Sequence, residues 1–124
     1  MRVPKIQESE LKVMDVLWER APITASEIAA LLAESTGWSK NTTYTVITKL
    51  VKKGIVQRTE PNFVCSPLIR KEQVQLAETT SLAQKLYNGS LKLMFARLIE
   101  QEAISDEELA ELKALIEERG KENG

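Results

Sequence analysis

Short polar and cationic side chains dominate one stretch in the middle of the sequence, Thr36 to Gly54 (TGWSKNTTYTVITKLVKKG). Within this stretch, residues that can face a protein core recur at the spacing of one side of a helix. These residues are Thr43, Val46, Ile47 and Leu50. Ser39 precedes them as a candidate N-cap, and Gly54 follows as a candidate end. The pattern predicts a helix over residues 40–53 whose opposite side is free to contact a polyanion.

The residues on the outward side of this helix have the chemistry of DNA recognition. A major groove admits one helix, and its base edges are read by short hydroxyl and amide side chains and by methyl groups that contact thymine. Lysine side chains neutralise phosphates, which positions a protein without specifying a sequence. We therefore expect DNA contacts from Ser39, Asn41, Thr42, Tyr44, Thr45, Thr48, Lys49 and Lys52, together with Arg58 farther along the chain. The candidate base readers are Asn41, Thr42, Thr45 and Thr48, and the candidate phosphate anchors are Lys49 and Lys52.

Other interpretations of single residues in this stretch remain open. Each threonine, taken alone, also fits a solvated helix face. Lys52 and Lys53 lie in the last turn, where cations stabilise the negative end of the helix dipole. Trp38 is better explained as a packing residue before the helix than as a contact to the DNA backbone. The set as a whole favours DNA contact.

Two further helices precede the candidate recognition helix. Gln7–Arg20 has Ser9 as a candidate N-cap and an apolar stripe, and Pro22 interrupts the helical pattern after it. Thr24 and Glu27 then form a capping-box pattern that opens a second helix. A short turn that contains glycine joins this helix to the third, which makes a helix-turn-helix.

A small hairpin is expected after the third helix. Ile55–Thr59 and Phe63–Ser66 are rich in β-branched and aromatic residues, and Glu60, Pro61 and Asn62 between them form the turn. Three helices followed by a hairpin are the order of a winged helix-turn-helix. The sequence thus predicts a winged helix-turn-helix DNA-binding domain over residues 1–68, in a chain whose fold class is mainly α with a small β-hairpin.

The sequence after Pro67 is helical again, in three pieces separated by Gly89 and by a second capping box that begins at Ser105. The last helix is expected to end before Gly120. Three short helices in about 50 residues cannot bury their apolar stripes alone, because so small a unit rarely supplies enough core. A second copy of the chain would cover them, which predicts a C-terminal helical dimerisation domain over residues 69–124 and a two-fold homodimer. The expected interface residues are Val74, Leu82, Leu86, Leu91, Phe95, Leu98, Leu109, Leu112 and Ile116.

The charge distribution supports this division. The 124 residues have a net charge of −1, but the sequence up to Lys71 has 11 Lys and Arg against 7 Asp and Glu, and the remainder has 6 against 11. A cationic first half beside an acidic second half is typical of a nucleic-acid reader with a separate association element.

The composition also excludes several classes of function. With one cysteine and no histidine, the chain has no internal disulfide, no imidazole base and no histidine-based metal site. We expect a protein that is not an enzyme and has neither metal nor cofactor, with Cys65 as a small buried or half-buried strand residue. The sequence shows no signal peptide and no apolar run long enough for membrane insertion, so a cytoplasmic location is expected.

Four segments of the sequence resemble the penicillinase repressor family, which controls β-lactamase and methicillin-resistance genes and is related to copper-responsive repressors. They are SELKVMDVLW (Ser9–Trp18), TASEI (Thr24–Ile28), WSKNTTYTVITKLVKKG (Trp38–Gly54) and SDEELAELKALIEE (Ser105–Glu118). The resemblance implies an N-terminal winged helix, a C-terminal helical dimerisation domain and a dimeric bacterial transcriptional repressor that binds a pseudo-palindromic promoter operator. The residues alone support a DNA-binding dimer, and the resemblance adds the role of repressor.

The sequence departs from that family in three places. Similar proteins often have a longer, basic wing, whereas the turn here is short and contains Glu60, so Arg58 is the wing residue expected to reach DNA. In antibiotic-responsive members, a membrane sensor with a metalloprotease domain triggers cleavage between an asparagine and a phenylalanine. The aligned residues are Arg97 and Leu98, which are therefore the candidate proteolytic induction site although their types differ. Copper-responsive members have a cysteine-rich C-terminal motif that this sequence lacks.

An alternative interpretation assigns the same fold to a protein–protein interaction module that does not bind DNA, because winged helices also serve in this role. The excess of cations between Thr36 and Lys71 argues against it, since seven Lys and Arg stand there against the single acidic residue Glu60. A small enzyme has no supporting set of residues.

Overall fold

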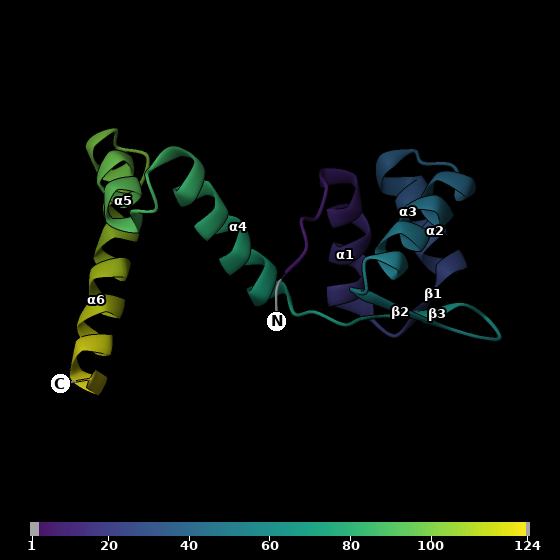
Figure 1. Cartoon of the computed structure of the whole chain (residues 1–124). Coiled ribbons are helices and arrows are strands. Elements are labelled where there is room, and N and C mark those ends of the chain that lie inside the picture. Colours follow the sequence, from purple (N-terminus) through teal and green to yellow (C-terminus); the bar gives the residue numbers. More distant parts are fainter. Residues whose placement is uncertain (1–2, 124) are drawn as a thin grey trace. The chain divides into compact units, whose positions relative to one another are not determined.

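Residues 3–123 are described in the computed structural model of the chain (Figure 1). They form six helices and three short strands, in the order α1 Glu8–Arg20, β1 Ile23–Thr24, α2 Ala25–Thr36, α3 Lys40–Lys52, β2 Val56–Thr59, β3 Val64–Pro67, α4 Lys71–Leu86, α5 Leu91–Glu100 and α6 Asp106–Asn123. The expected class, mainly helical with a small antiparallel sheet, is confirmed. The chain divides into two compact units that meet between Ala77 and Glu78, inside α4.

The N-terminus of α1 is capped differently from our expectation. Gln7 is the N-cap, and its backbone N–H donates to Glu10 Oε1 at 2.7 Å. Ser9, the expected cap, lies inside the first turn and is exposed. The carboxylate of Glu10 thus satisfies the N-cap amide, which moves the start of the helix by two residues.

The second helix begins as predicted. Thr24 is its N-cap, Glu27 N donates to Thr24 Oγ1 at 3.2 Å, and Thr24 N donates to Glu27 Oε1 at 3.4 Å. The helix ends at Gly37, which has a φ of 76° and so adopts the left-handed conformation that glycine tolerates best. The turn to α3 is therefore short, as a helix-turn-helix requires.

The wing is a three-stranded antiparallel sheet in the order β1–β3–β2, rather than the simple hairpin that we expected. Ile23 pairs with Cys65 and Thr24 with Val64, so the segment around Pro22 adds a strand that the sequence did not reveal. The first predicted strand begins one residue early but ends correctly at Thr59, and the second was placed one residue early at both ends. Phe63 has a φ of 51° and belongs to the turn, and its carbonyl accepts a hydrogen bond from Ala25 N at 3.0 Å.

The core of the first unit holds α3 by its inward face. Helix α3 packs against both α1 and α2 and against β2 (Figure 1). Thr43, Val46, Ile47 and Leu50 are at most 6% exposed, as the helical spacing predicted. Trp38 is half-buried and packs against the same core, which agrees with its interpretation as a packing residue. The opposite face of α3 is thereby turned to solvent.

The helices of the second unit bury much less. Gly89, with a φ of 81°, separates α4 from α5, and Ser90 caps α5 by accepting from Leu93 N at 3.0 Å. Helix α6 does not end before Gly120 as expected but continues to Asn123. A glycine inside a helix costs only about 1 kcal/mol, which the flanking turns can offset. Within residues 3–123, we find no helix with the length and apolarity that crossing a membrane requires.

Candidate nucleic-acid interface

The outward face of α3 is a ridge with a shallow depression on each side. Asn41, Thr45 and Lys49 line both depressions and lie one helical turn apart, so they form the ridge itself. The depression on one side is completed by Ser9, Trp38, Thr42 and Val46, and the one on the other side by Tyr44, Thr48 and Lys52. All the residues that we predicted on α3 are thus brought to one surface.

The N-terminal end of this surface is ordered by Ser39. Its Oγ accepts from Thr42 N at 3.1 Å and lies 2.9 Å from Thr42 Oγ1. Ser39 is therefore the N-cap that the sequence predicted, and its hydroxyl is already engaged within the helix. The adjacent Lys40, absent from our predicted contacts, is exposed with Nζ 5.5 Å from the Tyr44 ring centroid. The spacing of four residues between this lysine and tyrosine was the signal that could have revealed the pair.

The hydroxyl group of Thr48 binds a side chain of the wing and is not free to bind a ligand. Its Oγ1 donates to Tyr44 O at 2.9 Å and accepts from Arg58 Nη1 at 3.2 Å. The guanidinium carbon of Arg58 is in turn 5.3 Å from the centroid of the Phe63 ring. Because its hydroxyl proton is used inside the helix, Thr48 offers a ligand mainly its methyl group. Arg58 is fixed beside α3, between the helix and the turn of the wing.

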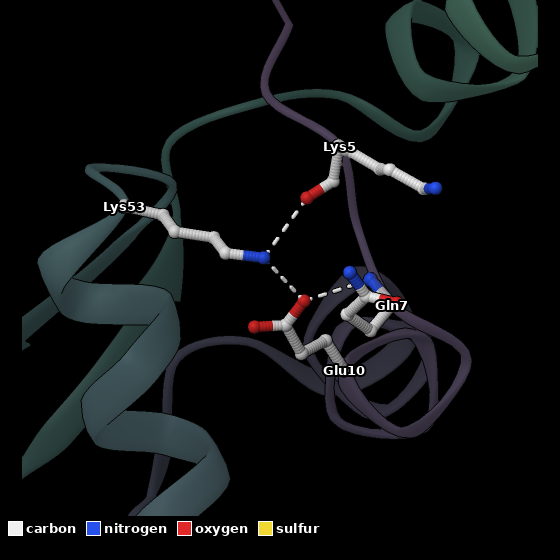
Figure 2. A network of polar contacts seen from close by, with 4 residues as sticks. All are labelled: Lys5, Gln7, Glu10 and Lys53. Carbon is white, nitrogen blue, oxygen red and sulfur yellow. Dashed lines mark hydrogen bonds and ion pairs between the residues drawn. The ribbon is translucent and has the colours of Figure 1, made fainter.

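Lys53 lies apart from the other cations of this region. Its Nζ is 2.5 Å from Glu10 Oε1 and donates to Lys5 O at 2.9 Å (Figure 2). The Glu10 side chain is 3% exposed and the Lys53 side chain is 30% exposed, so a partly exposed lysine pairs with a buried carboxylate. The sequence placed Lys53 at the end of the helix dipole and gave Glu10 no role, because nothing local links two residues so far apart.

The cations on the outward face have no such partner. Among residues 3–123, neither Lys49 nor Lys52 forms an ion pair, and both are exposed. Clustered unpaired cations produce a positive potential that attracts polyanions. The one acidic residue between Thr36 and Lys71, Glu60, lies in the wing turn and not on α3.

The residues expected at a dimer interface differ in how exposed they are to solvent. Five of them are large side chains that are 40–71% exposed, namely Leu82, Leu86, Leu91, Phe95 and Ile116. Leu98, Leu109 and Leu112 are half-buried. Val74 is 4% exposed and belongs to the core of the first unit. Ile99 and Leu115, which we had not included, are 48% and 67% exposed on the same helices.

The candidate proteolytic site lies within α5. Arg97 Nη1 is 3.3 Å from Glu100 Oε2, and both side chains are more than half exposed. Leu98 is half-buried beside it. A protease needs an extended substrate, so this helix would have to unwind locally before cleavage.

Residues 6–118 match the family model described as "Penicillinase repressor". The chain belongs to the penicillinase repressor family. It is similar to the penicillinase repressor of Bacillus licheniformis, with 31% identity over 119 residues that cover 94% of this chain and 93% of that protein. It is also similar to the methicillin resistance regulatory protein MecI of Mammaliicoccus sciuri, with 26% identity over 117 residues, or 93% and 95% of the two chains. The family that the sequence motifs suggested is confirmed, and it is a family of repressors.

Two solved structures of this penicillinase repressor family resemble the fold. The solution structure of the DNA-binding domain of the repressor BlaI has a TM-score of 0.52 and 32% identity, and the match covers 56% of this chain and 88% of that one. Bacillus licheniformis BlaI in its monomeric form, in complex with the blaP half-operator, gives the same TM-score and identity, with coverage of 57% and 89%. The likeness supports the winged-helix architecture that the sequence predicted.

Proposed function

We propose that this protein is a bacterial transcriptional repressor that binds promoter DNA as a dimer through α3. The observation that carries the proposal is the ridge of Asn41, Thr45 and Lys49, which lies opposite a fully buried face of the same helix. A helix held in this way can enter a major groove with its polar side forward. The BlaI structure that resembles this fold was solved with a half-operator, which supports the same use of this chain.

The contacts proposed along the face divide by chemistry. Asn41, Thr42 and Thr45 meet base edges, where a good contact discriminates against a wrong base by about 1–3 kcal/mol. Lys49 and Lys52 neutralise phosphates, and Lys40 at the start of the helix joins them. Tyr44 and Ser39 lie near the start of α3, at the entry to the groove, and order the first turn of this helix. Arg58, held by Thr48 at 3.2 Å, reaches the backbone beside the groove, which makes Thr48 a positioning residue.

The proposed dimer forms through the C-terminal helices. Large apolar side chains such as Leu86, Phe95 and Ile116 are 43–71% exposed on them, and exposed apolar groups of this size favour association. A two-fold dimer presents two α3 helices to two half-sites, so the operator is expected to be pseudo-palindromic, with half-sites about 10 base pairs apart or a multiple of that spacing. The division proposed from the sequence is residues 1–68 for DNA binding and 69–124 for dimerisation, although the start of α4, with Val74, packs with the core of the first unit.

A repressor of this kind acts in the cytoplasm, where the promoter is. Its release from the operator requires a signal, and cleavage between Arg97 and Leu98 by a membrane sensor protease is one route that the family suggests. Ala96→Gly weakens the helix by about 1 kcal/mol and leaves both residues of the candidate bond unchanged, so it should accelerate cleavage there by the sensor protease if local unwinding limits the reaction.

The function is tested by selecting DNA with the purified protein. The wild-type chain is incubated with a pool of random-sequence duplexes, and retained duplexes are amplified and sequenced over several rounds. Enrichment of one sequence with approximate two-fold symmetry is the expected result. A pool that stays random, together with no salt-sensitive retardation of genomic fragments, would refute DNA recognition and favour an interaction module instead.

Thr45 tests the position of the groove contact. The Thr45→Val variant keeps the methyl group and removes the hydroxyl, whereas Thr45→Ser does the opposite. At least one of them should lose about tenfold in affinity for the selected duplex, the value of one base contact, without losing affinity for a scrambled duplex. Equal binding by both variants and the wild type would place Thr45 outside the groove.

A further inference from the structure

Lys53 connects the recognition helix to two other segments of the first unit. It follows the last residue of α3, and its backbone N–H donates to Lys49 O at 3.0 Å, so its position is tied to the last helical turn. Its Nζ contacts Glu10 Oε1 at 2.5 Å and Lys5 O at 2.9 Å (Figure 2). The C-terminal end of α3 is therefore tied both to the start of α1 and to the segment before it.

Glu10 is the centre of this network. Its side chain is 3% exposed, and Oε1 accepts from Gln7 N at 2.7 Å as well as from Lys53 Nζ. A buried carboxylate is tolerated only when it is paired and hydrogen-bonded. Oε1 of Glu10 thus caps α1 and also binds Lys53 at the end of α3. Both contacts are hydrogen bonds, whose strength depends on their geometry.

A hydrogen bond from Arg58 Nη1 to Thr48 Oγ1 at 3.2 Å ties the outer side of α3 to the wing, whereas the contacts of α3 with the core are of a different kind. Val46, Ile47 and Leu50 hold the helix to the core through apolar contacts, which have no directional preference. Such contacts alone permit small rotations about the helix axis. Hydrogen bonds to base edges do not, because they weaken steeply when distance or angle is wrong. A directional contact at the end of α3 would remove this freedom.

We propose that Glu10 and Lys53 are specificity-determining positioning residues, whose ion pair fixes the orientation of α3 and withholds the Lys53 charge from the phosphates. This inference rests on the proposed function, because it assigns the orientation of α3 to DNA recognition. An ion pair with one buried partner, such as Glu10 here, adds little stability over an apolar pair of similar volume, but it defines one geometry. Lys53 thereby contributes to reading the operator without touching it.

The test replaces the pair while leaving the fold intact. In the double variant Glu10→Gln with Lys53→Met, the glutamine amide oxygen can still accept from Gln7 N, and the methionine fills the volume of the lysine stem. The expected result is a thermal unfolding midpoint near that of the wild type and an affinity for the selected duplex about tenfold lower, equal to the loss of one base contact. Affinity for a scrambled duplex of the same length, and its salt dependence, should be unchanged.

Lys52→Met is the matched control, since Lys52 is the adjacent lysine and is exposed. It should weaken binding to both duplexes and reduce the salt slope by about one counterion. The inference is overturned if the double variant keeps the wild-type ratio between the two affinities. It is also overturned if that variant loses about one unit of salt slope, which would make Lys53 a phosphate contact.

The two single variants serve as the second test if the double variant does not fold. Glu10→Gln leaves an amide oxygen that can accept from Lys53 Nζ, so Lys53→Met alone is measured with it: that variant keeps the Glu10 cap of α1 and removes the contact to the end of α3, and its ratio of affinities should fall while the salt slope stays unchanged. An unchanged ratio would again refute the positioning role. A wild-type protein that binds both duplexes equally would instead refute the proposed function, so the two failures are distinguishable.

Discussion

The two compact units of this chain differ in where their apolar side chains lie. In the first unit, Met14, Ile28 and Ile47 are completely buried. In the second unit, Leu86, Leu115 and Ile116 are 67–71% exposed, and among its described residues only Ala83 and Met94 are buried apolar side chains. The first unit can therefore fold around its own core, whereas the helices of the second need another surface to cover them.

Charge follows the same division. The exposed face of α3 is cationic, whereas α6 begins with three acidic residues, Asp106, Glu107 and Glu108. Acidic helices repel phosphates, so their apolar side chains are better suited to a second copy of the chain than to DNA. The contrast fits the proposed assignment of DNA recognition to the first unit and of association to the second, and substitutions in either unit can challenge that assignment.

Phe95→Asp should produce the largest effect. Phe95 is 43% exposed on α5 within the proposed interface, and a two-fold dimer would bury the introduced charge twice. We expect monomers in sedimentation and a loss of at least about 100-fold in affinity for the selected duplex, since each monomer then binds one half-site. Gln101→Asp, at the end of the same helix, is the control and should remain dimeric. A dimeric Phe95→Asp protein would remove this residue from the interface.

Ile47→Ala and Ile116→Ala compare the stability contributed by a buried side chain of the first unit with that of an exposed side chain of the second. Ile47 is 0% exposed, and truncating a buried isoleucine lowers the free energy of unfolding by about 3 kcal/mol. Ile116→Ala, at a site 71% exposed in the single chain, should leave the unfolding of the winged unit unchanged. Chemical denaturation followed by tryptophan fluorescence compares the two, because Trp18 and Trp38 both pack against the core of the first unit. A similar decrease in the free energy of unfolding in both variants would contradict the difference in burial between the two units.

Thr43→Val should stabilise the first unit. Thr43 is 0% exposed, and its Oγ1 has no hydrogen-bond partner among the described residues. Replacing a buried unpaired hydroxyl by a methyl group of the same shape raises the free energy of unfolding by about 1 kcal/mol. Denaturant titration is the measurement, with the exposed Thr45→Val as a control that should shift by less than about 0.5 kcal/mol. A destabilised Thr43→Val protein would show that this hydroxyl is satisfied in solution.

The smallest effect is expected at Cys65. Burial raises the pKa of the Cys65 thiol above its ordinary value, and Arg58 opposes the shift. Because the folded thiol keeps its proton where the unfolded one has lost it, stability should be constant below the ordinary thiol pKa of about 8.5 and fall as the pH rises above it. Thermal unfolding from pH 7 to 10, compared with a Cys65→Ala variant, isolates this contribution. Identical pH dependence in both proteins would refute it.

The sequence predicted those parts of the fold that depend on local pattern. The inward face of α3, the Ser39 and Thr24 caps and the break at Gly89 follow from helical spacing and from the chemistry of helix ends. The strand β1 could not be predicted in this way, because a segment of two residues has no periodicity and exists only through its pairing with Cys65 and Val64.

The candidate site, like the fold, could be predicted from the sequence only where it depends on local pattern. Helical spacing brought the predicted residues of α3 to one surface, but it could not show that Thr48 is engaged by Arg58. Glu10 was missed as well, since its partner Lys53 is 43 residues away along the chain. Contacts between separate segments leave no trace in a local pattern, and the proposed positioning roles of Thr48, Glu10 and Lys53 all depend on such contacts.

The salt dependence of DNA binding shows whether the outward face of α3 contacts DNA. Affinity for the selected duplex is measured at several salt concentrations for the wild type, for Lys49→Ala, and for Lys113→Ala on α6 as a control of equal charge change. We predict that Lys49→Ala reduces the slope of log K against log salt by about one, whereas Lys113→Ala leaves it unchanged. A Lys49→Ala variant with the wild-type affinity and slope would contradict the assignment of α3 to the groove.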